Sequence, residues 1–180
     1  MESLTDFFDE GILNCTQCDL CKYEVNRDSG KMLGFGSYGA TMIIGQNPSY
    51  KRRTERYAMS PSDVEGTPEF LLWKVLKEVK FPTKYVYVTN FLKCSTPENR
   101  PPTNSEIKAC YTNWLSQEIT ICHPTLIVCL GKNTREMLDS FSTPISIIKD
   151  NVFHHSFIAR NKSKYDEWRN QWLDVKSFLS

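Results

Sequence analysis

The seven cysteines are candidate metal ligands. Cys15 and Cys18 form a C-x2-C pair, and Cys94 and Cys110 lie far downstream. A single C-x2-C pair is weak evidence in a chain with seven cysteines. Four thiolates suit a tetrahedral zinc ion or an iron–sulfur cluster. The cysteines by themselves do not decide between these two metals.

The remaining cysteines are Cys21, Cys122 and Cys129. Cys129 lies in an apolar run and Cys122 at the end of a predicted helix, where thiols behave as small hydrophobic side chains. Cys21 extends the first pair to C-x2-C-x2-C, so its role stays open. The N-terminal residues 1–15 lack the basic start and apolar stretch of a secretory signal. We therefore expect a cytoplasmic protein without a disulfide framework.

Polar residues follow three segments that are predicted to be strands. Gln46 and Asn47 follow residues 41–44, Asn90 follows residues 85–89, and His154 begins the loop 154–156. In parallel sheets, ligands bind beyond the carboxyl ends of the strands. These loops are therefore candidates for one site, although Asn47-Pro48 is also a common turn sequence.

Apolar patterning predicts a single α/β domain over residues 1–180. Continuous apolar runs separated by helices are typical of a parallel sheet that is covered on both faces. We predict a three-layer α/β/α sandwich with a central, mostly parallel four-stranded sheet. The predicted strands are 41–44, 85–89, 126–130 and 151–153. The predicted helices are 4–13, 68–80, 104–121, 133–140 and 164–179, with Asn104 and Ser105 as caps of the third.

The net charge is +1, from 22 Lys and Arg against 21 Asp and Glu, which does not by itself indicate nucleic-acid binding. Basic residues form two groups, each of which follows one of the polar loops. A run of charges is usually a solvated face. The two groups are Lys51, Arg52, Arg53 and Arg56, and Arg160, Lys162 and Lys164.

No apolar run approaches the ~20 residues of a membrane span.

Four segments resemble the family 4, iron–sulfur-containing uracil-DNA glycosylases. They are NCTQCDLC from residue 14, VYVTNFLKCSTPENRPPTNSEIKAC from residue 86, PTLIVCLGKNTREML from residue 124 and FHHSFIAR from residue 153. The resemblance implies a DNA glycosylase whose [4Fe-4S] cluster supports the fold. It also implies the cluster's ligands, which are Cys15, Cys18, Cys94 and Cys110, with zinc as the alternative.

The resemblance further implies the roles of site residues. Such an enzyme flips a nucleotide out of the duplex before it cleaves the base–sugar bond. Asn47 would orient the attacking water, Asn90 would read the base edge, and His154 would stabilise the departing base. Gln46 and Tyr57 would contact the base, although Tyr57 fits a core or surface position equally well. The DNA contacts would come from Lys51, Arg52, Arg53, Ser156 and Arg160.

The chain departs from the family in both active-site motifs. Gly45-Gln46-Asn47-Pro48-Ser49 stands where the family has Gly-Glu-Ala-Pro-Gly, and His155 replaces the proline of a His-Pro-Ser motif. These changes favour a modified pyrimidine, such as a base of phage DNA, with uracil as the competing substrate. A monofunctional, monomeric enzyme with an antiviral role is expected. The alternative is a catalytically inactive iron–sulfur DNA-binding protein.

Overall fold

Four parallel strands and one short antiparallel strand form the central sheet of the computed structural model, which describes residues 4–23, 31–50, 56–144 and 148–179. The strand order is β1-β3-β2-β4-β5. The four parallel strands are β2 (Thr41–Gly45), β3 (Val86–Asn90), β4 (Leu126–Leu130) and β5 (Ile148–Val152). The predicted mostly parallel sheet is therefore confirmed. The prediction missed β1 (Phe35–Gly36), which pairs antiparallel with β3, because two residues carry no periodic signal.

Every residue of β2, β3 and β4 is buried, as expected for strands covered on both faces. Alternate side chains belong to two different cores. Ile43, Val88 and Val128 face one core, whereas Met42 and Ile127 face the other. The sheet is thus the middle layer of the predicted three-layer sandwich.

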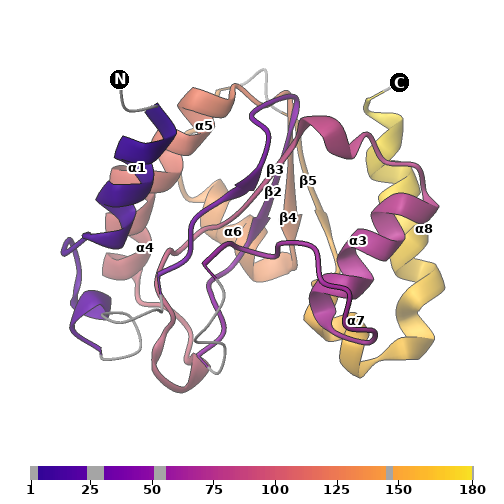
Figure 1. The fold of residues 1–180 in the computed structure, drawn as a ribbon, viewed down its shortest axis with the longest axis horizontal. Helices are drawn as coiled ribbons and strands as arrows, with labels where there is room; N and C mark the ends of the chain where they lie inside the picture. The colour runs from indigo at the N-terminus through magenta and orange to yellow at the C-terminus, as the bar shows by residue number, and fades with distance from the viewer. Residues whose placement is uncertain (1–3, 24–30, 51–55, 145–147, 180) are drawn as a thin grey trace.

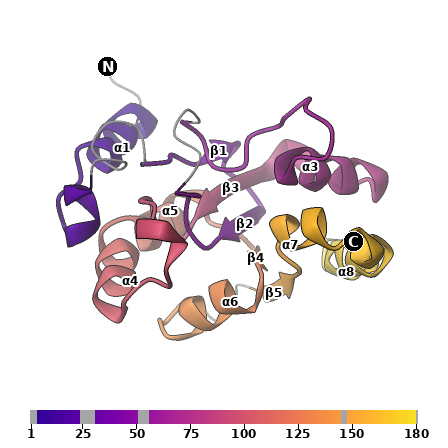
Figure 2. The same ribbon diagram turned by 90° about the horizontal axis from the view of Figure 1, so that it is seen from below.

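The helices divide between the two faces of the sheet, as Figures 1 and 2 show. One core contains residues of α3, α7 and α8, including Leu72, Ile158 and Trp168. The other contains residues of α5 and α6, including Ile119 and Leu138. The helices are α1 (Leu4–Leu13), α3 (Pro68–Glu78), α4 (Asn104–Cys110), α5 (Ser116–Cys122), α6 (Lys132–Asp139), α7 (His155–Arg160) and α8 (Tyr165–Ser177).

Four details of the predicted helices and strands were wrong. The helix expected over 104–121 is interrupted by a π-helical turn, Tyr111–Leu115. Its cap is Thr103, which forms a capping box with Glu106, rather than Asn104 or Ser105. The segment 154–156, predicted as a loop, instead starts α7, and β5 begins earlier than the predicted residue 151. Short helices such as α7 are too brief for hydrophobic periodicity to reveal.

In the part of the chain that the structure describes, no helix has the length and apolar character to cross a membrane.

Candidate functional site

A cavity of about 660 Å³ opens at the carboxyl edge of the parallel sheet. It is lined by Gln46 and Asn47 after β2, by Asn90 at the end of β3, by Gly131 after β4 and by His154 after β5. The three loops that the sequence predicts as parts of one site therefore meet at this cavity. The loop after β4 also lines the cavity and was not predicted, although Gly131 between a strand and a helix could have indicated it.

Asn47 lies in the loop directly after β2 and is partly buried. Its Nδ2 donates a hydrogen bond to the carbonyl oxygen of Pro48 at 2.9 Å. This bond fixes the side chain within its own loop and leaves Oδ1 as the acceptor on the amide. An acceptor beside the cavity can orient a water molecule, although an amide cannot deprotonate it.

Asn90 is buried at the end of β3, where its register partner on β2 is Gly45. A Cβ atom on Gly45 would lie 2.5 Å from Asn90 Oδ1 and 3.0 Å from Met59 Cε. Glycine is therefore the residue that leaves room for the Asn90 amide beside β2. An amide held in this way offers one donor group and one acceptor to the edge of a pyrimidine.

His154 is the N-cap residue of α7, and its ring lines the cavity. Its Nδ1 accepts a hydrogen bond from the Ser156 backbone N–H at 3.1 Å, and the Ser156 hydroxyl lies 2.8 Å from the same atom. Burial, followed by the nearby positive charge of Arg160, lowers the pKa of His154 to about 4. The ring is thus neutral near pH 7. Since Nδ1 is an acceptor, the proton is on Nε2, which is a donor.

His155 and Glu69 form a second polar pair at this cavity. Both are buried, and His155 Nε2 lies 3.9 Å from Glu69 Oε1. The rings of His154 and His155 stack with centroids 4.2 Å apart. Glu69 is in the first turn of α3, where Thr67 is the N-cap and an acidic residue is favoured by the helix dipole. Among the described residues, Glu69 is the only carboxylate that lines this cavity.

The other predicted contact residues have different positions. Gln46, Ser156 and Arg160 line the cavity, and Arg160 is exposed. Tyr57 is exposed, forms a bridge with Leu33 and is not among the described residues that line the cavity. The basic residues Lys51, Arg52 and Arg53 lie outside the described residues.

Phe157 and Ile158 are adjacent in α7 but have different surroundings. Ile158 is buried in the core with α3 and α8, so it is not available for contact with DNA. Phe157 is 36% exposed and lines the cavity, so it remains available for contact with DNA. The helical course of α7 explains the difference, because adjacent residues on a helix face different directions.

The four cysteines predicted as metal ligands line a second, smaller cavity. Trp114 Nε1 donates a hydrogen bond to Cys15 Sγ at 3.1 Å, and the Lys93 backbone N–H donates to Cys110 Sγ at 3.3 Å. Burial raises the pKa of Cys94 strongly and that of Cys110 to about 12. Burial is also the main cause of the raised pKa of Cys18.

No group of three or more His, Cys, Asp or Glu side chains in the described ranges is arranged to hold a metal ion. Metal ligation by the four cysteines therefore stays a prediction. Cys21 does not line the smaller cavity. Cys122 and Cys129 are buried in the core with α5 and α6, as their apolar surroundings in the sequence predicted.

The segment between Cys94 and Cys110 also reaches the larger cavity. Asn99 lines it and accepts a hydrogen bond from the Tyr50 backbone N–H at 2.8 Å. The Ser95 hydroxyl donates to the Ser49 carbonyl oxygen at 3.3 Å. The loop that joins two of the cysteines thus contacts the loop that carries Asn47.

Known proteins match most of the chain. The family model described as the uracil DNA glycosylase superfamily matches residues 36–176. The chain is 33% identical over 158 residues to the type-4 uracil-DNA glycosylase of Archaeoglobus fulgidus, covering 85% of this chain and 74% of that protein. It is 28% identical over 196 residues to the type-4 uracil-DNA glycosylase of Thermotoga maritima, covering 99% and 96%. It is also 34% identical over 125 residues to a Bacillus phage SP01 protein named DNA polymerase, covering 68% of this chain and 13% of that protein.

Proposed function

Since this chain belongs to the uracil-DNA glycosylase superfamily, we propose that it is a DNA glycosylase that hydrolyses the N-glycosidic bond of a non-standard pyrimidine. One observation carries the proposal. Asn47, Asn90 and His154 come from three different strand ends and line a single cavity. Together they supply a hydrogen-bond acceptor that can orient a water, an amide that can read the base edge and a neutral imidazole that can donate a hydrogen bond.

Asn47, Asn90 and His154 would each have a different role in the reaction. The target nucleotide must leave the base stack to enter the cavity. Asn90 would then hydrogen-bond the edge of the base, while Asn47 Oδ1 orients a water toward the sugar. As the base–sugar bond breaks, negative charge grows on the base, and the Nε2–H of His154 would stabilise it. Phe157 and Arg160 line the cavity, and they would contact the DNA.

We propose that water, rather than a lysine, attacks the sugar. Lys132 lines the cavity, but its ammonium is mostly exposed and lies 3.4 Å from Glu136 on the next turn of α6. A lysine nucleophile must be desolvated to lose its proton near neutral pH. The expected product is an intact abasic site, and borohydride should trap no covalent adduct between the protein and DNA.

The favoured substrate is a modified pyrimidine, with uracil as the competing one. Glu69 and the stacked rings of His154 and His155 surround part of the cavity with polar groups. A cytosine-derived base is a poorer leaving group than uracil, so additional polar groups near the base would assist its departure. An antiviral role is the consequence that we propose.

We also propose that Cys15, Cys18, Cys94 and Cys110 bind a [4Fe-4S] cluster. Four thiols line one cavity, and two of them accept N–H hydrogen bonds. Four thiolates are the ligand set of such a cluster, with a zinc ion as the alternative. When bound, the cluster would cross-link the N-terminal segment to the 94–110 loop.

The decisive experiment supplies the purified protein with duplexes and genomic DNAs that carry different bases. Free base and alkali-labile abasic sites are then measured. Release of a modified pyrimidine supports the full proposal, and release of uracil alone contradicts the choice of substrate. If no DNA releases a base while the protein still binds DNA, the catalytically inactive alternative is correct.

A further inference from the structure

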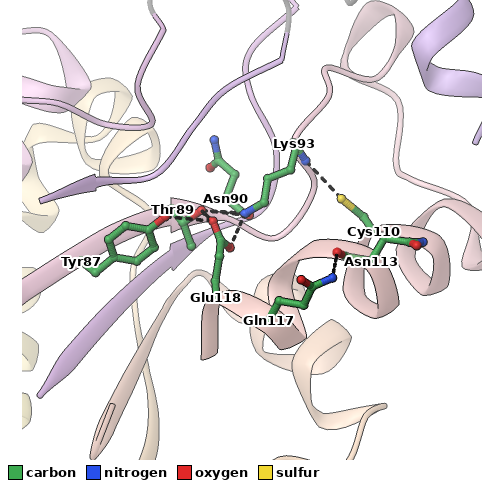
Figure 3. Close-up of polar contacts among 8 residues, drawn as sticks. All are labelled: Tyr87, Thr89, Asn90, Lys93, Cys110, Asn113, Gln117 and Glu118. Carbon is green, nitrogen blue, oxygen red and sulfur yellow. Dashed lines mark hydrogen bonds and ion pairs between the residues drawn. The ribbon is translucent and has the colours of Figure 1, made fainter. Parts of the chain in front are cut away.

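Lys93 lies between the two cavities, and the function proposed above gives it no role. It is 1% exposed, which is unusual for a lysine. Its side chain is 2.5 Å from Glu118 Oε2, and Glu118 is also buried. Figure 3 shows that the Lys93 ammonium and backbone nitrogen point in different directions, the first toward β3 and the second toward Cys110.

The hydrogen bonds of the Lys93 ammonium are complete. An ammonium group has three N–H donors. Lys93 Nζ donates to Thr89 Oγ1 and to the Asn90 carbonyl oxygen, both at 2.7 Å, and to Glu118 Oε2. Each donor has one acceptor, so the position of the ammonium is well defined.

The Glu118 carboxylate also accepts hydrogen bonds from two side chains of β3. Its Oε1 accepts hydrogen bonds from the hydroxyls of Tyr87 and Thr89, both at 3.0 Å. Tyr87 and Thr89 are two residues apart on β3, so their side chains lie on the same face of the sheet. The side chain of Asn90 lies on the opposite face, and Figure 3 shows its amide pointing away from the Glu118 carboxylate.

The π-helical turn explains how Glu118 reaches Lys93. Cys110 and Glu118 are eight residues apart, which corresponds to about 80° around an uninterrupted α-helix. A π turn takes up one extra residue, which reduces this angle to about 20°. The turn Tyr111–Leu115 therefore brings Cys110 and Glu118 to one helix face, where both contact Lys93.

We propose that Lys93, neutralised by Glu118, is a positioning residue for Asn90. Its ammonium donates a hydrogen bond to the carbonyl oxygen of Asn90, three residues earlier in the chain, and its backbone N–H donates to Cys110 Sγ. The strand end that reads the base and the cysteine cavity are thereby joined through one residue. This inference rests on the proposed function, in which Asn90 contacts the flipped base.

Energetics favour positioning over stabilisation as the reason for this pair. Removing two charges from water is costly, and an apolar or neutral pair of similar shape is often as stable. Removing only one partner leaves a buried charge and is strongly destabilising. The useful variant is therefore the double substitution Lys93→Met with Glu118→Gln. It removes both charges and retains an acceptor for the Tyr87 and Thr89 hydroxyls.

The test compares the double variant with the wild type and with Tyr87→Phe. Tyr87→Phe removes one hydrogen bond of Glu118 but leaves every contact between Lys93 and Asn90. We expect the double variant to fold, to bind duplex DNA and to lose about 100-fold in kcat, since small displacements of a contact residue have effects of this size. Tyr87→Phe should remain within about twofold. A folded double variant with wild-type kcat and KM would overturn the proposal.

A spectroscopic measurement separates this inference from the proposed function. The NMR signal of the Asn90 side-chain amide, assigned through its loss in Asn90→Asp, should move in the double variant, whereas that of Asn161 should not. If the wild type releases no base, the proposed function fails, but the amide signal still tests the positioning. An unchanged Asn90 signal would overturn the role of Lys93 whatever the activity.

Discussion

Gly45 and Asn90 are register partners at the ends of β2 and β3, and a Cβ atom on Gly45 would come within 2.5 Å of Asn90 Oδ1. We therefore expect Gly45→Ala to displace the Asn90 amide and to lower kcat about 100-fold. Initial rates of base release at saturating DNA measure the effect. The matched control is Gly39→Ala, whose Cβ would lie 3.0 Å from Tyr85 Cβ at the opposite end of the sheet. Equal rates for both variants would contradict the role given to Gly45.

The second prediction concerns the protonation of His154. Its folded pKa of about 4 is below the ordinary value of 6.5. Between these pH values the unfolded chain binds a proton that the folded chain does not. The free energy of unfolding should therefore rise with pH from about 4 to 6.5 and then level off. The contribution of this residue is no more than about 3 kcal/mol.

Urea unfolding at pH 4.5 and at pH 7.5 measures this dependence. His154→Gln should reduce the difference between the two pH values, and it should lower kcat about 100- to 1000-fold through loss of the Nε2–H donor. The control is His123→Asn, at an exposed position with φ of 45°, a conformation that asparagine tolerates. If His154→Gln retains the pH dependence of the wild type, the neutral state of His154 near pH 7 is contradicted.

The third prediction separates catalysis from binding. Asn47→Ala removes the amide that we expect to orient water, while the Asn47 backbone and the β2 strand end are unchanged. Base release should fall at least about 100-fold, and the Kd for a duplex that carries the substrate should stay within about threefold. Single-turnover rates and fluorescence anisotropy give the two quantities. A parallel loss of binding and rate would show that Asn47 acts in binding.

The fourth prediction is electrostatic. Arg160 is exposed and lines the cavity, and we expect it to contact a phosphate. Arg160→Gln should weaken binding and reduce the slope of log K against log salt concentration by about 1. Arg169→Gln on α8 is the control, because Arg169 does not line the cavity. An unchanged slope for Arg160→Gln would exclude its contact with a phosphate.

The fifth prediction compares cysteines in the two environments. Cys110→Ala should lower the iron content and the visible absorption of the purified protein, since Cys110 lines the small cavity. Cys122→Ala should leave both unchanged, because Cys122 is packed in the hydrophobic core. Metal analysis measures the iron content of each variant, and absorption spectra measure its visible absorption. Stoichiometric zinc without visible absorption in the wild type would contradict the cluster.

The sequence was informative wherever one segment carried its own signal. Buried runs such as residues 126–130 predicted the parallel strands, because strands covered on both faces must be apolar throughout. Polar residues after those strands predicted Asn47, Asn90 and His154 as neighbours, since parallel strands end at one edge. The resemblance of the cysteine-containing segments to the family 4 enzymes selected the four cysteines that line one cavity.

Tertiary structure decided the features that depend on contacts between distant segments. Nothing in the sequence near Lys93 or Glu118 shows that they pair, because the π turn before α5 and the position of α5 beside β3 bring them together. Glu69 reads as an ordinary first-turn acid, yet packing of α3 against α7 places it beside His155. Local patterns predicted the ends of the buried strands β2, β3 and β4 to within one residue. The burial, protonation state and hydrogen-bond partners of a side chain depend on which distant segments pack within a few ångströms of it.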